Sequence, residues 1–564
     1  MSAVAHAPGP RRGSLATLAC LALALVALGW FAIYLNKVYY RAHGPFYDSL
    51  SYMNFMAQIM DQVRREGFLA GARIGVSNST VFLPWLESAV LGLFLEPKRT
   101  NAVLLQLPLV IVQVAAAYAY FRRVAAYARP VAVAFSLLTV CFAGVFFFNG
   151  GLSDLRMDLA QALTFGAAAA LLCVARRTGQ LAHWLLFGAV LAIGLLFRAT
   201  SAVYVVLLVG IAGLVDLVRP VTKRSRCLRN YLAAGLVAAV LAGWFYIVNF
   251  ALLVDYYTVR NYDAMARLPI SESIKHLGFV FRMHMGWPLC ALAAAVFAVE
   301  VVSRARARLP LLRCLNWPML LAGVAPVAFL VLFGTSPGNP FVSLVSVPGL
   351  LMFLLAPYAG PQPIGSPRWE QGKRLVLIAA TVLVVVLAAR AGLRSHREVV
   401  DPFTPDAAAL RQITGAIDRD LAARNRKDAA FEVTYVGSLD SLVILNSLVF
   451  DQHFALPGGI NASKNGLQLV AVQPALANPV DWKQIPGERP EDKLKTLTAE
   501  AVAKVDYLIV PEDGNTFIEH HPINPHALAY RDMLLAAGGM TRIAGPIRVS
   551  RMESVSVYRN DNRK

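Results

Sequence analysis

Long apolar runs repeat through the first two-thirds of the chain, separated by short polar segments. Most of them approach the roughly 17 to 25 residues that a helix needs to cross a bilayer. The pattern predicts a polytopic α-helical membrane protein with about 11 to 13 transmembrane helices, and a composition that is 57% hydrophobic and 15% charged agrees. The runs cover residues 15–35, 102–120, 131–148, 159–174, 181–197, 202–217, 231–254, 285–302, 317–333, 341–355 and 375–389.

A further apolar run, residues 80–95, is short and contains Pro84 and Glu87. Basic residues favour the cytoplasmic side of short loops, so the position of this run affects every later loop. If it does not span, the basic segments 11–12, 122–129, 176–177, 219–229, 304–313 and 368–374 all fall on one side. If it does span, all later loops change sides, and Lys98 and Arg99 are the only basic residues that fit the charge rule better. We therefore expect residues 80–95 to form an interfacial or re-entrant helix.

This orientation places the loops after residues 35, 148, 197, 254 and 333 on the outer face, with everything beyond residue 389. The net charge of +19 needs no nucleic-acid partner, because Lys and Arg gather in the loops that orient the helices. Arg11 and Arg12 precede an apolar stretch without a convincing small-residue cleavage site, which is typical of an uncleaved signal-anchor with a cytoplasmic N-terminus.

From about residue 400 the charge rises and the apolar runs shorten, which indicates a soluble domain over residues 396–564, after a membrane domain over residues 1–395. Residues 406–427 read as an amphipathic helix, residues 431–436 and 506–510 as short buried strands, and residues 547–558 as one alternating strand. We expect a small extracytoplasmic α/β domain docked on the outer membrane face.

The cysteines lie in apolar segments or at their cytoplasmic edges, so a disulfide framework is not expected. No CxxC or HExxH signature supports a structural zinc, and the need for a divalent metal stays open. The six cysteines are Cys20, Cys141, Cys173, Cys227, Cys290 and Cys314.

The first candidate for chemistry is Asp48, which follows the first span in the outer segment 36–101. Tyr52 comes one helical turn later. A carboxylate at the membrane surface can be ionised and serve as a general base toward a lipid-borne substrate. The alternative is that Asp48 is the N-cap of an interfacial helix.

The second candidate lies in the outer loop 149–158. Asp154 and Asp158 are four residues apart, which would place them on one helical face, and Arg156 could pair with either. Acidic residues also favour helix N-termini, so a helix start is the alternative. Two acidic clusters on one membrane face favour a catalytic site.

Basic residues on the outer face are exceptions to the charge rule and suit a phosphate or diphosphate ligand. Arg198 lies in a tight turn between two helices, and Arg260, Arg282 and His284 belong to the outer segment 255–284. Solvated loop charges or contacts with lipid headgroups are the alternative.

This layout resembles that of the GT-C glycosyltransferases. The resemblance rests on Asp48 followed by Tyr52, on the sequence FLPW at 82–85, and on Asp158 starting the run DLAQALTF at 158–165. It is closest to the branch of protein O-mannosyltransferases and the aminoarabinose transferase of lipid A, and covers about the first 390 residues. In place of the paired acids of many relatives, Ser49 follows Asp48.

The resemblance implies an inverting transfer of a sugar from a polyprenyl-phosphate donor to an acceptor hydroxyl of an envelope glycolipid, polysaccharide or protein. It implies transfer on the extracytoplasmic face of a bacterial inner membrane. Asp48 would be the base, Asp158 the acid of the second loop, and Arg198 a phosphate-binding group.

Two other classes of function remain. A transporter or flippase would place charges near the midplane of broken helices, whereas most acids here lie at one membrane face. A non-catalytic partner in envelope polysaccharide assembly would use the C-terminal domain for docking. Retained activity after Asp48→Asn would favour that second alternative.

Overall fold

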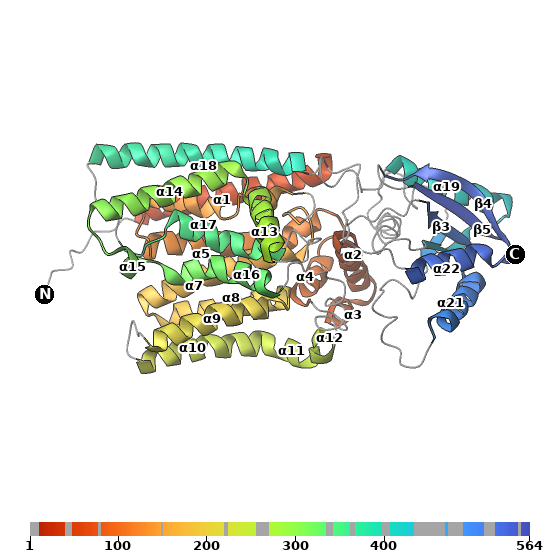
Figure 1. Cartoon of the computed structure of the whole chain (residues 1–564), viewed down its shortest axis with the longest axis horizontal. Helices are drawn as coiled ribbons and strands as arrows, with labels where there is room; N and C mark the ends of the chain where they lie inside the picture. The colour runs from red at the N-terminus through yellow and green to blue at the C-terminus, as the bar shows by residue number, and fades with distance from the viewer. Residues whose placement is uncertain are drawn as a thin grey trace.

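The computed structural model describes residues 11–39, 48–76, 81–147, 150–218, 224–254, 270–333, 342–360, 367–395, 407–433, 468–471, 489–512, 525–550 and 554–563. Figure 1 shows two parts: a bundle of helices and, beyond one end of it, a smaller unit with a sheet. The bundle contains everything from α1 to α18.

Helices of membrane-spanning character dominate the bundle. Within the described residues, six helices are long and apolar enough to cross a membrane, and five shorter apolar helices accompany them. The chain is therefore a multi-pass membrane protein, as predicted. The main helices are α1 (Arg11–Tyr34), α5 (Asn101–Arg123), α7 (Met157–Thr178), α8 (Leu181–Phe197), α9 (Ser201–Val218), α10 (Arg224–Ala238), α14 (Trp287–Arg306), α16 (Trp317–Phe333) and α18 (Pro367–Ser395).

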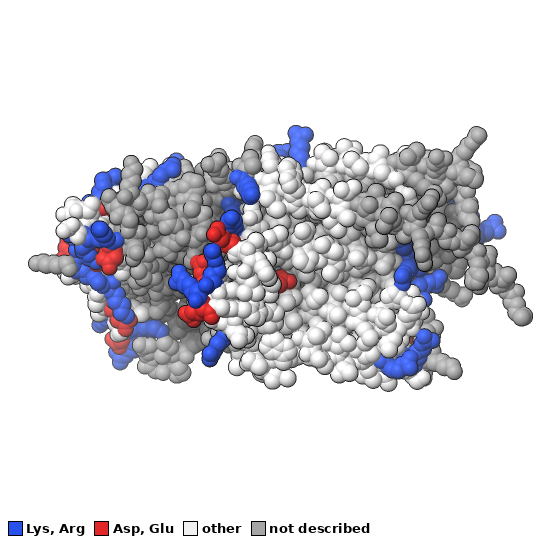
Figure 2. Space-filling model, turned by 180° about the vertical axis from the view of Figure 1, so that it is seen from behind, with Lys and Arg blue, Asp and Glu red and all other residues white. Residues whose placement is uncertain are grey.

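The surface agrees with this assignment. Figure 2 shows a broad belt over the bundle in which charged residues are scarce, with Lys and Arg gathered toward its two ends. Exposed side chains in the helices include Leu23, Val206, Val240 and Ile247, each at least 67% exposed. Such an apolar belt suits contact with lipid. In contrast, α7 is buried throughout its span, packed against α5 and α8 at the centre of the bundle.

The predicted helix over residues 131–148 is wrong in its second half. Helix α6 (Arg129–Leu138) ends early, and the chain continues through irregular backbone into the short 3₁₀ turn η2 (Ala143–Phe146). All four residues of η2 are buried, and η2 packs against α18 and α13 (Ile270–Met285). Irregular backbone is tolerated at membrane depth where protein surrounds it.

Two other predicted spans are also interrupted. The run 231–254 contains the π-helical turn η3 (Ala239–Gly243), α11 (Trp244–Val248) and α12 (Phe250–Val254). The run 341–355 consists of η5 (Val342–Ser346) and α17 (Val347–Leu355). The remaining short elements of the bundle are η1 (Leu35–Tyr39) and α15 (Leu311–Cys314).

Three further helices lie at the end of the bundle nearest the sheet (Figure 1). They are α2 (Asp48–Glu66), α3 (Phe68–Val76) and α4 (Leu83–Gly92). Ten residues of α4 extend only about 15 Å, half of the roughly 30 Å hydrocarbon core. As predicted, the helix in this region is too short to span. It packs on α2, where the rings of Trp85 and Phe55 are 4.8 Å apart.

The C-terminal unit is a five-stranded sheet in the order β2-β1-β3-β5-β4. The first three strands are parallel, and the β4–β5 hairpin joins antiparallel to β3. The strands are β1 (Asp428–Val433), β2 (Gln468–Ala471), β3 (Tyr507–Pro511), β4 (Met540–Arg548) and β5 (Ser554–Asn560), accompanied by α19 (Ala407–Ala423), α21 (Pro490–Lys504) and α22 (Pro525–Ala536).

The predicted helix 406–427 and the strand 506–510 match α19 and β3. Strand β1 begins three residues before the predicted 431–436, of which residues 434–436 lie outside the described chain. The single strand predicted over 547–558 is wrong, since these residues belong to the two strands of a hairpin. Buried apolar residues occupy odd-numbered positions on both sides of the turn, so the alternation of the sequence does not reveal where the chain reverses. These residues are Ile547, Val549, Val555 and Val557.

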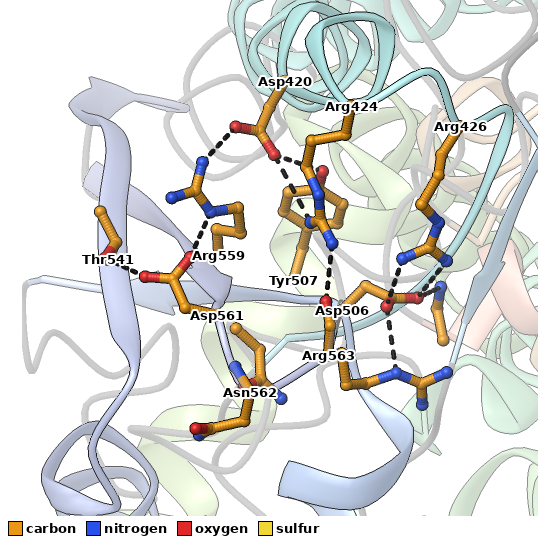
Figure 3. Close-up of polar contacts among 12 residues, drawn as sticks. Asp420, Arg424, Arg426, Asp506, Tyr507, Thr541, Arg559, Asp561, Asn562 and Arg563 are labelled. Atoms are coloured by element: carbon orange, nitrogen blue, oxygen red, sulfur yellow. Dashed lines mark hydrogen bonds and ion pairs between the residues drawn. The ribbon is translucent and has the colours of Figure 1, made fainter.

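The end of the chain is bound to this unit by ion pairs (Figure 3). Nη1 of Arg559 lies 2.7 Å from Oδ1 of Asp420 in α19. Nε of Arg563 and Nη1 of Arg426 lie 3.1 and 3.0 Å from Oδ1 of Asp506, just before β3. The C-terminal end of β5 lies on the side away from the bundle (Figure 1). Because β3 is antiparallel to β5, β3 and its parallel neighbours β1 and β2 run toward the bundle.

Candidate active site

The second acidic cluster lies at the end of the bundle that faces the C-terminal unit. The backbone N–H of Phe82, just before α4, donates to the carbonyl of Leu196 near the end of α8 at 3.0 Å. This bond joins the turn that carries Arg198 to the short helices of the same end (Figure 1). Residues 150–156, which lead into α7, meet this turn through the side chains described below.

The loop 150–156 is fixed by contacts from several elements. The N–H of Leu152 donates to the carbonyl of Val145 in η2 at 2.8 Å. Asn36, at the end of the first helix, donates from Nδ2 to the carbonyl of Ser153 at 3.0 Å. Gln106 of α5 donates from Nε2 to the carbonyl of Asp154. The loop is therefore held by three separate segments of the bundle.

Asp154 is buried in this loop, and its carboxylate accepts backbone hydrogen bonds from Gly150 at 2.6 Å and Leu155 at 2.9 Å. Burial raises its pKa to about 7, although these bonds and the nearby charges of Arg156 and Arg99 lower it.

The prediction that Asp154 and Asp158 share a helical face is wrong, because α7 begins only at Met157. Gly150 adopts a φ of 86° and Arg156 is extended, so the chain turns sharply before the helix starts. A Cβ on Gly151 would lie 2.2 Å from the carbonyl oxygen of Phe147, so this close approach requires glycine.

Asp158, in the first turn of α7, lies between two guanidinium groups. Nη1 of Arg198 is ion-paired with Oδ1, and Nε of Arg156 lies 3.7 Å from Oδ2. The side chain of Asp158 is 4% exposed and that of Arg156 is 5% exposed, whereas Arg198 keeps 23% of its side chain exposed. The structure thus brings together three of the predicted residues, and Arg198 is the member most open to a ligand.

The turn that carries Arg198 is hydrogen-bonded to α7 through the side-chain amide of Gln161. Nε2 of Gln161 donates to the hydroxyl oxygens of Thr200 at 3.0 Å and Ser201 at 3.1 Å. Gln161 lies about one helical turn after Asp158, so both polar contacts come from one face of α7. The position of Arg198 is therefore set by α7 as well as by its own turn.

The resulting site is a row of alternating charges: Arg99, Asp154, Arg156, Asp158 and Arg198. Asp154 is influenced by the charges of Arg99 and Arg156, and Asp158 is paired with Arg156 and Arg198. Among the side chains that the structure describes, three guanidiniums and two carboxylates belong to this row. Arginine is well suited to binding phosphate, because its planar fork presents several N–H donors to the oxygens.

Sequence reasoning missed Gln106, Gln161 and the placement of Arg99. Both glutamines are nearly fully buried inside apolar spans. A polar side chain in a membrane helix needs a partner and often marks function, so their presence in apolar runs was the available signal.

The other predicted residues lie on other elements or outside the described part of the chain. Asp48 is the first residue of α2, and its side chain lies outside the described part of the chain, as does all of Arg260. Tyr52 packs with Trp85 of α4 at a ring distance of 5.9 Å. Arg282 is exposed and lies over the rings of Phe279 and Trp287 at 5.5 and 5.8 Å, a surface position at α13.

His284, two residues after Arg282, is 1% exposed. Its ring lies 5.5 Å from that of Phe147, and a Cβ on Gly144 would lie 2.7 Å from its Nδ1. His284 therefore contacts the η2 region that precedes the loop 150–156. Among the described residues, no group of three or more His, Cys, Asp or Glu side chains could hold a metal ion.

No protein-family model matches this sequence, and no curated protein matches it. Solved structures do. ArnT from Cupriavidus metallidurans, in a crystal structure with undecaprenyl phosphate, matches with a TM-score of 0.56 and 11% identity over 96% of this chain and 97% of that chain.

Two more solved structures are similar in part. Arabinofuranosyltransferase AftD from Mycobacteria gives a TM-score of 0.49 and 14% identity over 98% of this chain, which spans 42% of that protein. The archaeal oligosaccharyltransferase AglB from Archaeoglobus fulgidus, in complex with an inhibitory peptide and a dolichol-phosphate, gives a TM-score of 0.47. The identity is 10%, over 87% of this chain and 69% of that chain. The chain has a GT-C-like fold.

Proposed function

We propose that this protein is an inverting glycosyltransferase that moves a sugar from a polyprenyl-phosphate donor to an acceptor hydroxyl. The observation that carries this proposal is the charged row at the loop end of the bundle. The fold that holds it matches, over nearly the whole chain, a structure bound to undecaprenyl phosphate. An arginine-rich site at the end of a helical bundle suits the phosphate of a lipid whose tail lies in the bilayer.

The chemistry requires a base for the acceptor and cations for the leaving phosphate. A phosphate leaves as an anion, so positive charge assists its departure more than an acid would. Arg198, the more exposed guanidinium, contacts the phosphate, and Asp48 removes the proton from the attacking hydroxyl. The hydroxyl attacks the anomeric carbon from the side opposite the phosphate, which inverts that centre.

Asp158 has a different role from Asp48 in this scheme. Each of its oxygens lies against a guanidinium, so it orients Arg198 and Arg156. Asp154 fixes the loop through its backbone hydrogen bonds. Both act as positioning residues, and the reacting carboxylate is Asp48.

The proposal includes an arrangement across the membrane. The site faces outward in a bacterial inner membrane, with residues 1–395 as the transferase domain and residues 396–564 as an extracytoplasmic domain. Figure 1 supports it, since the C-terminal unit lies beyond the same end of the bundle as α2 and α4. The acceptor is an envelope glycolipid, polysaccharide or protein that reaches the site from that side.

The phosphate-binding role is tested with Arg198→Ala in the purified full-length protein. A lost charge-assisted hydrogen bond costs about 1.5–3 kcal/mol, so binding of polyprenyl phosphate should weaken about 10- to 100-fold. Arg198→Lys, which keeps the charge, should recover part of it.

The matched control is Arg226→Ala, an exposed arginine bound to the carbonyl of Gly179 at 2.9 Å, at the other end of α7. It should bind the donor like the wild type. Equal affinity of the wild type and Arg198→Ala would contradict the role assigned to Arg198.

A further inference from the structure

Helix α13 is amphipathic and crosses the direction of the long helices. In Figure 1 the long helices of the bundle run along the horizontal axis, whereas α13 runs across them. Ser273, Leu277 and His284 are buried, and α13 packs against η2, α16 and η5. On the rest of its surface, Ile274 and Phe279 are 56% and 51% exposed. An amphipathic helix that crosses the bundle and exposes apolar side chains suits a position in the membrane interface.

The junction between α13 and α14 places Arg282 at the edge of a membrane span. The N–H of Gly286 donates to the carbonyl of Arg282 at 2.9 Å, and Gly286 adopts a φ of 76°, so α13 ends in a sharp turn. Helix α14 begins at the next residue, Trp287, and is one of the candidate spans. Its 20 residues extend about 30 Å, the thickness of the hydrocarbon core. Arg282, just before this start, therefore lies at the level of the lipid headgroups.

The guanidinium of Arg282 is held by two aromatic rings. Its Cζ lies 5.5 Å from the ring centre of Phe279 and 5.8 Å from that of Trp287. Trp287 is 68% exposed, and tryptophan is typical of the boundary between hydrocarbon and headgroups. Among the described side chains these rings are the partners of Arg282, and no carboxylate forms an ion pair with it. The exposed guanidinium therefore keeps N–H donors for a ligand at the membrane surface.

The ligand that suits this position is a phosphate carried by a lipid. A guanidinium presents its N–H groups to phosphate oxygens as a planar fork, and the exposed rings beside it suit the adjoining hydrocarbon. Lys275 on the same helix differs, because its Nζ lies 2.8 Å from Oε1 of Glu272.

We propose that Arg282, with Phe279 and Trp287, binds the headgroup phosphate of an anionic phospholipid such as phosphatidylglycerol. This lipid site is separate from the charged row of the candidate active site. It goes beyond the proposed function and does not depend on it, since a bundle with any activity could hold a phospholipid there.

The test titrates the purified full-length wild type, Arg282→Ala and Arg282→Lys with phosphatidylglycerol in detergent, and native mass spectrometry gives the affinity for the first bound lipid. Diacylglycerol, which lacks the phosphate, glycerol 3-phosphate, which lacks the acyl chains, and undecaprenyl phosphate are titrated in parallel. We expect Arg282→Ala to weaken phosphatidylglycerol binding about fivefold or more and to leave diacylglycerol binding unchanged. Arg282→Lys should recover part of the loss. The matched control Lys275→Ala, on the same helix, should bind like the wild type.

The other outcomes overturn the inference. Unchanged phosphatidylglycerol affinity in Arg282→Ala, or an equal loss for diacylglycerol, means that Arg282 does not recognise the headgroup phosphate. A wild type that binds glycerol 3-phosphate as tightly as phosphatidylglycerol has a site for free phosphate instead of a lipid.

Two further results assign Arg282 another role. An equal loss for undecaprenyl phosphate assigns Arg282 to the donor site, which overturns the separate lipid site and leaves the proposed function standing. A thermal unfolding temperature that falls equally in Arg282→Ala and Arg282→Lys, measured without added lipid, makes Arg282 structural and also overturns the inference.

Discussion

The two carboxylates of the candidate site, Asp154 and Asp158, are both buried, but their neighbours differ. Asp158 has guanidinium groups on both sides, whereas Asp154 relies mainly on two backbone N–H groups. Burial raises the pKa of Asp154 to about 7, although the backbone hydrogen bonds and the charges of Arg156 and Arg99 lower it.

A prediction follows for the pH dependence of stability. Between about pH 4 and 7 the folded protein keeps a proton on Asp154 that the unfolded chain has lost, so the free energy of unfolding falls as the pH rises and levels off above pH 7. The slope is at most about 1.4 kcal/mol per pH unit. In the Asp154→Asn protein, the thermal unfolding temperature, measured in detergent, should change less between pH 5 and 7 than it does in the wild type.

Glu96→Gln provides the control, because the Glu96 side chain is 61% exposed. Glu96→Gln should leave the change of the free energy of unfolding with pH as it is in the wild type. An Asp154→Asn protein with an undiminished slope would contradict the assignment of this titration to Asp154.

Part of the site could be predicted at this scale. Asp158 and Arg198 were found because each stands at the end of an apolar run, where a charge is conspicuous. Their pairing needs the three-dimensional packing of α7 on α8, which spacing does not give. The placement of Arg99 escaped prediction because its neighbour Asp154 is more than fifty residues away in the sequence.

The elements of the bundle follow the apolar runs closely, and the exceptions have local causes. Helix α16 occupies the predicted residues 317–333, because a continuous apolar run can only be satisfied as a helix in lipid. The run 131–148 is equally apolar, yet it breaks after α6 because buried residues of η2 pack on other helices. Hydropathy cannot distinguish a lipid-exposed helix from a buried irregular segment.

Close helix packing gives a prediction for α8 and α10. A Cβ on Gly188 of α8 would lie 2.3 Å from the backbone oxygen of Ala234 in α10, and this backbone contact has little room to adjust. Gly188→Ala should therefore destabilise the protein by about 1–3 kcal/mol, seen as a lower thermal unfolding temperature.

Gly235 is the matched control, since it neighbours Ala234 on α10 and a Cβ there would meet nothing within 4 Å. Gly235→Ala should leave the unfolding temperature unchanged or raise it slightly, because alanine favours the helix. Equal effects of the two substitutions would contradict the close approach of α8 and α10.

At the scale of the molecule, the sheet unit lies beyond the end of the bundle that carries α2 and α4, the end where the candidate site lies (Figure 1). The apolar belt over the bundle indicates how the bundle sits in a bilayer (Figure 2). This arrangement was predicted in outline, since the composition changes near residue 400. The hairpin of β4 and β5 was not, because its alternation runs through the turn.

The central claim, sugar transfer with Asp48 as the base, is tested most directly by assaying purified wild type and Asp48→Asn against a panel of polyprenyl-phosphate sugars, with donor binding measured separately. Exposed Glu66→Gln at the other end of α2 serves as the control. We predict that Asp48→Asn loses about 10²- to 10⁴-fold in turnover while donor binding stays intact. Full turnover in Asp48→Asn, or no donor bound by the wild type, would contradict the claim.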